Sequence, residues 1–196
     1  MASAEVAGTP ALPRRGFTDH ALLGMAVFVF TEIMLFSAFI SAFLIVRNST
    51  PPGSWPPAGQ PRLPFAGTAF NTAALLASGV LVWFAHRALK TRGPAAARVP
   101  LGLALLLGTL FVLLQGREWA GLIAQGLTLS SSQVGGFFYL IIGTHALHAI
   151  VALVALLSCW LALMAGRLKP ARFGAWQLFW YFVVLMWPVL WLVVYR

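Results

Sequence analysis

The residues best placed to do chemistry are one acid and two histidines inside apolar stretches of the chain. The chain has 196 residues and only 4 acidic ones, and of these Glu32 lies deepest in an apolar stretch. His145 and His148 are spaced i, i+3, so they share one face of a helix. At 1.5 Å per residue, Glu32 is ~16 Å and His145 is ~15 Å from the start of its stretch. We therefore expect Glu32 to contact His145 or His148 across a helix–helix interface.

Three interpretations of this cluster are open from the residue types. A charge near the bilayer centre costs about 2.5–3.5 kcal/mol on insertion scales, so Glu32 should face protein or water. The cluster is then either a hydrogen-bonded group that fixes helix packing or a lipid-headgroup or proton-related site in a cleft. Two histidines and a carboxylate can also form a metal site. His20 and His86 lie at the ends of apolar stretches and suit the interface better than metal or haem ligation.

Other polar residues indicate anchoring and helix packing. Arg117, Glu118 and Trp119 come at the end of an apolar stretch, where we predict that they anchor the helix at the membrane interface. Asn71 and Ser78 are seven residues apart and so lie on one face of a helix. We expect both to make hydrogen bonds to a neighbouring helix.

The elements that position these residues are transmembrane helices. The chain is 60% hydrophobic and 9% charged, whereas soluble domains have roughly 45–50% apolar and about 25% charged residues. A span needs about twenty apolar residues. The predicted fold is an all-α polytopic bundle of about five transmembrane helices in one membrane domain, residues 1–196. The predicted spans are 20–46, 66–89, 99–118, 135–165 and 175–195, with a proline-rich loop at 47–65.

The basic residues indicate how the chain crosses the membrane. The net charge is +9, but the basic residues fall between spans and do not follow one face, so we expect no nucleic-acid partner. Cytoplasmic loops carry an excess of Lys and Arg, which predicts the N-terminus inside and the C-terminus outside. On the predicted inner side lie Arg14, Arg15, Arg87, Lys90, Arg92, Arg98, Arg167, Lys169 and Arg172; on the outer side lie Arg47, Arg62, Arg117 and Arg196.

Several motifs occur in a fixed order along the chain. They are Gly24–Phe36 (GMAVFVFTEIMLF), Trp55-Pro56-Pro57, Asn71-Thr72, Leu75–Ser78, Gln115–Trp119 (QGREW), Gly136–His148 (GFFYLIIGTHALH) and the Trp180–Tyr195 helix. At these residues the chain resembles subunit III of the haem-copper cytochrome oxidases. The larger members of that family have seven helices, and this chain looks like the short form that lacks the first two.

The resemblance implies a function that the residues alone do not. Family members bind no haem or copper and pack beside subunit I, which carries these cofactors, in a complex with subunit II. They hold phospholipids in a cleft and help to sustain proton uptake during oxygen reduction. By resemblance, Glu32, His145 and His148 belong to the polar positions that line the bundle. The expected location is a bacterial-type plasma (inner) membrane, as a multi-pass protein.

The last helix departs from the family pattern. Family members usually read Trp-His-Phe-Val-Asp there, and this chain has Tyr181 and Val184 in place of the histidine and the aspartate. Losing an intramembrane acid together with its partner is less costly than leaving either of them unpaired. Tyr181 can still donate one hydrogen bond.

The leading interpretation is a non-catalytic subunit III of a proton-pumping terminal oxidase. The alternatives are a small transporter or proton channel that uses Glu32, a metal-dependent membrane enzyme, and a related accessory protein of nitric oxide reduction. No internal repeat of the kind found in many transporters is visible.

Overall fold

The computed structural model describes residues 17–49 and 65–195. Their order is α1 (Phe17–Asn48), α2 (Phe65–Thr91), α3 (Pro94–Ala124), α4 (Gln133–Met164) and α5 (Pro170–Val194), with no strand among the described residues. Each helix is long and apolar enough to cross a membrane. The all-α fold with five candidate spans is therefore confirmed. The prolines predicted to form the 47–65 loop lie outside the described residues.

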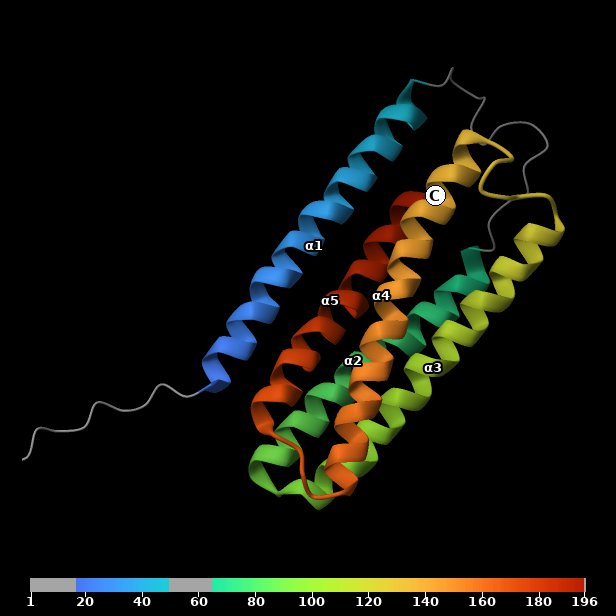
Figure 1. Cartoon of the computed structure of the whole chain (residues 1–196). Helices are drawn as coiled ribbons and strands as arrows, with labels where there is room; N and C mark the ends of the chain where they lie inside the picture. Colours follow the sequence, from blue (N-terminus) through green and yellow to red (C-terminus); the bar gives the residue numbers. More distant parts are fainter. Residues whose placement is uncertain (1–16, 50–64, 196) are drawn as a thin grey trace, which may run out of the picture.

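Helix α5 is the central element of the bundle. It packs against α1, α4 and α2, while α2 and α3 form a closely packed hairpin. In Figure 1, α1 lies along one edge and α3 along the other, with α4 and α5 between them. Half of the most apolar window of α5 is buried, compared with 17% of that of α1. Helix α1 is thus an edge helix, and the other helices leave most of its surface uncovered.

Local sequence explains where the helices begin. Pro94 and Pro170 occupy first positions of α3 and α5, where the missing N–H of proline costs nothing. The hydroxyl of Ser132 caps α4 by accepting a hydrogen bond from the Gly135 N–H at 3.0 Å. Gly166, with φ of 66°, allows the chain to leave α4 in the left-handed region.

Helix α3 is longer than the predicted 99–118 span at both ends. Its charged residues Arg98, Arg117 and Glu118 all lie within the helix, which runs from Pro94 to Ala124. Hydropathy marks the hydrocarbon layer, and backbone hydrogen bonding continues beyond that layer into the interface. Charge was therefore a poor guide to where this helix ends.

The core is aromatic and closely packed, with buried rings from both α1 and α5. Trp180, Trp187, Phe36 and Phe43 are almost fully buried. A methyl group added at Gly108 would lie 2.8 Å from the side chains of both Leu153 and Trp180. The absence of a side chain at this position allows α3, α4 and α5 to approach one another.

Candidate functional site

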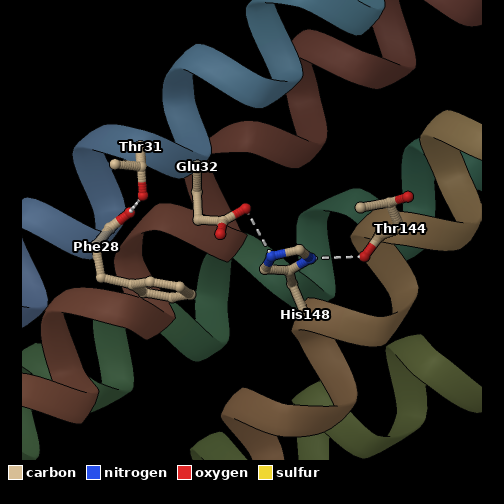
Figure 2. Close-up of polar contacts among 5 residues, drawn as sticks. All are labelled: Phe28, Thr31, Glu32, Thr144 and His148. Carbon is tan, nitrogen blue, oxygen red and sulfur yellow. Dashed lines mark hydrogen bonds and ion pairs between the residues drawn. The ribbon is translucent and has the colours of Figure 1, made fainter.

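Glu32 of α1 and His148 of α4 form a hydrogen-bonded pair. Nε2 of His148 lies 2.9 Å from Oε2 of Glu32, and Nδ1 lies 2.7 Å from the carbonyl oxygen of Thr144 (Figure 2). The side chains of His148 and Glu32 are 13% and 14% exposed. The contact expected between Glu32 and one of the two histidines is therefore present, and His148 provides it.

The partners of His148 define how many protons the pair carries. A carbonyl oxygen can only accept, so Nδ1 of His148 must donate to Thr144. Nε2 then either donates to an ionised Glu32 or accepts from a protonated one. In both arrangements one proton lies between the two side chains and the pair has no net charge. A neutral pair is the form that a membrane interior tolerates best.

Aromatic rings and an apolar groove surround the pair. The Phe36 ring meets the His148 ring edge-on at 5.6 Å, and Phe179 and Phe182 lie at 6.0 and 6.1 Å. His148 lines a cavity of about 300 Å³, together with Met25, Phe28, Leu147, Val151, Trp176 and Phe179. The histidine is thus accessible from one side, between α1, α4 and α5.

A second cavity adjoins the first, and its mostly apolar wall includes two basic residues. Its volume is about 560 Å³, and it shares Met25 and Trp176 with the first. The rest of its wall is formed by the start of α5 and by Ala21, and includes Lys169 and Arg172. One amino group of Arg172 donates to the Ser158 hydroxyl at 3.0 Å. We refer to the two cavities together as the α1–α5 groove.

His145 faces a different part of the bundle. Its ring stacks on Trp187 at 5.3 Å with an interplanar angle of 30°, and it is 1% exposed. His145 therefore does not join Glu32, although one turn of helix separates it from His148. Within the described residues there is no group of three His, Cys, Asp or Glu side chains that could hold a metal ion.

Glu118 belongs to a polar network that the sequence did not predict. Gln115 donates from Nε2 to Glu118 Oε2 and to the Tyr195 hydroxyl, both at 3.0 Å. Asn71 donates to Gln115 Oε1 at 3.2 Å, and the Thr68 hydroxyl donates to Glu118 at 3.0 Å. We call these five residues the Gln115 network. It joins α2, α3 and the end of α5.

The other polar residues singled out from the sequence behave differently from one another. Asn71 donates to α3, as expected, but the Ser78 hydroxyl donates to the Leu75 carbonyl in its own helix. The interhelical bond predicted for Ser78 is therefore wrong. A serine side chain is short and readily bonds to the preceding turn. Tyr181, which was expected to donate, accepts a hydrogen bond from Gln177 Nε2 at 2.6 Å within α5.

The residues proposed as interface anchors lie on α3. Arg117 is exposed, Glu118 is half-buried in the Gln115 network, and the Trp119 ring meets Tyr139 edge-on at 6.0 Å. Anchoring stays a prediction for Arg117 and Trp119, and the structure adds hydrogen bonds for Glu118. The sequence analysis did not single out three members of the Gln115 network, which are Gln115, Thr68 and Tyr195. They share one feature that is visible in the sequence: each is a polar or amphipathic side chain near the same end of its apolar stretch.

The sequence matches one known protein family over almost its whole length. Residues 14–196 match the family described as Cytochrome c oxidase subunit III. The chain belongs to that family. It is therefore a subunit III of a haem-copper oxidase, a multi-pass membrane protein and part of a membrane complex.

Similar curated proteins agree with this family membership. Cytochrome c oxidase subunit 3 of Heterololigo bleekeri is 33% identical over 180 residues, which cover 88% of this chain and 68% of that protein. The protein of the same name from Lumbricus terrestris is 35% identical over 184 residues, with the same coverage. That from Drosophila yakuba is 34% identical over 183 residues and is covered to 67%. These matches do not favour the transporter or channel considered from the sequence.

In the last helix of this subunit III, Val184 stands where the family usually has an aspartate, and the local packing explains why an apolar residue fits. Val184 is 3% exposed, and its side chain lies against Gly79 of α2, where an added methyl group would be 3.1 Å from it. An aspartate at this position would be buried at a tight helix–helix contact. The apolar residue therefore suits the packing of α5 on α2.

Proposed function

We propose that this chain is the non-catalytic subunit III of a proton-pumping terminal oxidase, which packs beside subunit I in a complex that also contains subunit II. The haem and copper are expected in subunit I. The complex is expected to lie in a bacterial-type plasma membrane, and the N-terminus of this chain is expected on the inner side. In this proposal the chain supports its partner by retaining phospholipid and by sustaining proton uptake during oxygen reduction.

The observation that carries the lipid proposal is the make-up of the α1–α5 groove. Lys169 and Arg172 line its basic part, and apolar side chains line the part that extends to His148. This order matches an anionic phospholipid, with a negative headgroup followed by acyl chains. Each Lys or Arg near a membrane surface contributes about 1 kcal/mol to attraction of anionic lipid. The Glu32–His148 pair lies beside the acyl part of the groove and holds the shared proton.

The lipid proposal is tested by removing the two basic residues. The double variant Lys169→Gln with Arg172→Gln should weaken retention of phosphatidylglycerol by the purified complex by roughly thirtyfold, because about 2 kcal/mol is lost. Native mass spectrometry measures the retained lipid, and repeated oxygen-consumption assays measure how long turnover lasts. Turnover should decline sooner in the variant, while haem content should stay the same.

A matched control comes from the same loop. Arg167 has the same charge, is exposed and does not line the α1–α5 groove, so Arg167→Gln should retain lipid like the unmodified complex. Equal lipid retention in the double variant and the control would contradict the proposal. Glu32→Gln should likewise leave haem content intact while it shortens turnover. Loss of haem in that variant would argue against a supporting role.

A further inference from the structure

A second crevice lies between α3 and α4, away from Glu32. Its volume is about 140 Å³, and Trp187 of α5 forms part of its wall. Most of the lining is apolar or small, and the polar groups in it belong to Gln115, His145 and the indoles of Trp119 and Trp187. We call this the His145 crevice. It is separate from the α1–α5 groove, because the two have no lining residue in common.

His145 has polar atoms that its protein neighbours do not satisfy. Neither Nδ1 nor Nε2 has a hydrogen-bond partner among the described residues, although the side chain is 1% exposed. The indole N–H of Trp119, in the same crevice, also lacks one there. His148 differs, since both of its ring nitrogens are bonded. Buried polar groups in proteins are almost always bonded to protein or to ordered water.

We propose that the His145 crevice binds a small cluster of water molecules. A neutral imidazole offers one donor and one acceptor, and an indole offers a donor only. Several water molecules together can satisfy all three atoms, because each water can both donate and accept. The volume suits a few waters, each of which takes about 30 Å³. It is well below the roughly 300–1,000 Å³ of cavities that bind larger organic ligands.

The water cluster joins His145 to the Gln115 network. Gln115 lines the crevice, and its Oε1, which accepts from Asn71, can accept a second hydrogen bond. A polar connection then runs from Glu118 through Gln115 to the histidine. The amide of Gln115 has no readily transferable proton, so this connection does not conduct protons. It hydrates a histidine that the helices would otherwise bury without partners.

Radiolytic footprinting of the intact oxidase complex in oxygen-18 water tests this proposal. Hydroxyl radicals formed from bound water oxidise the side chains next to it and leave labelled oxygen on them. Phe111 and Phe43 are a matched pair, because both are phenylalanines and are only 2% and 1% exposed. Phe111 lines the crevice, whereas Phe43 of α1 packs against the Phe137 ring at 6.1 Å and lines neither this crevice nor the α1–α5 groove. Phe111 should take up label severalfold faster than Phe43.

Two variants keep the test decisive. His145→Leu removes the polar atoms, and Ala146→Leu fills the crevice while it leaves His145 in place. Either change should reduce labelling of Phe111 to the level of Phe43, and His145→Gln should retain it. Equal labelling of Phe111 and Phe43 in the unmodified complex would overturn the proposal. Undiminished labelling of Phe111 in a correctly assembled Ala146→Leu complex would overturn it as well.

Discussion

Substitutions at Glu32 and His148 should differ in cost because the two residues share one proton. In Glu32→Gln, the new amide N–H can donate to Nε2 of a neutral His148, so the bond survives in altered form. We expect a loss of about 1 kcal/mol in the free energy of unfolding, because a neutral hydrogen bond contributes about that much less than a charge-assisted one. In Glu32→Leu, Nε2 has no partner, and the expected loss rises to about 1–3 kcal/mol.

His148→Leu should be the most costly single change. It leaves Glu32 inside the bundle without its basic partner, and breaking a buried ion pair in this way costs about 3–5 kcal/mol. The side chains of the pair are 13% and 14% exposed, so little solvent is available to replace the lost contact. The double variant Glu32→Leu with His148→Leu removes both polar groups. It should cost less than the sum of the single variants by about 0.5–3 kcal/mol.

The assay is an SDS titration of the detergent-solubilised complex, with unfolding of this chain followed by fluorescence. Thr31→Ala is the control, because the Thr31 hydroxyl bonds only within α1, to the Phe28 carbonyl at 2.7 Å. It should unfold close to the unmodified protein. The reasoning fails if His148→Leu is no more destabilising than Glu32→Leu. It also fails if the double variant costs the full sum of the two.

Two further predictions concern helix packing. Gly108→Ala should destabilise the bundle by about 1–3 kcal/mol, since the added methyl group overlaps Leu153 and Trp180; Gly121→Ala on the same helix, with open space around it, should have no such effect in the same SDS titration. Gln115→Leu should cost more than Ser78→Ala, because Gln115 connects three helices whereas Ser78 bonds only within α2; equal midpoints for these two variants would contradict the network.

The helices were the most predictable part of this protein. Each apolar run of sufficient length became a helix, because the backbone must satisfy its own hydrogen bonds in lipid. The estimated distance of each residue from the start of its apolar stretch also indicated that Glu32 would lie near the two histidines. It could not distinguish them, since residues three apart share a face only approximately. The rotation of α4 decides this, and places His148 toward α1 and His145 toward Trp187.

The Gln115 network could not be predicted in the same way. Its members come from α2, α3 and the end of α5, so predicting it requires knowing which helices are neighbours and how they are rotated. Asn71 and Ser78 lie on one face, yet only Asn71 is long enough to reach α3. Side-chain length and helix rotation, which spacing does not encode, separate a residue that joins helices from one that bonds to its own turn.

The edge position of α1 has a consequence for how the protein is made. Synthesis proceeds from the N-terminus, so Glu32 enters the bilayer 116 residues ahead of His148. At about 5–20 residues per second, the wait is roughly 6–23 s. During that time the acid has no histidine to share its proton with, and α1 has no α5 to pack against. Until the bundle forms, the Glu32 side chain of a newly made α1 therefore needs another polar partner. The insertion machinery, a lipid headgroup or water drawn into the bilayer can provide it.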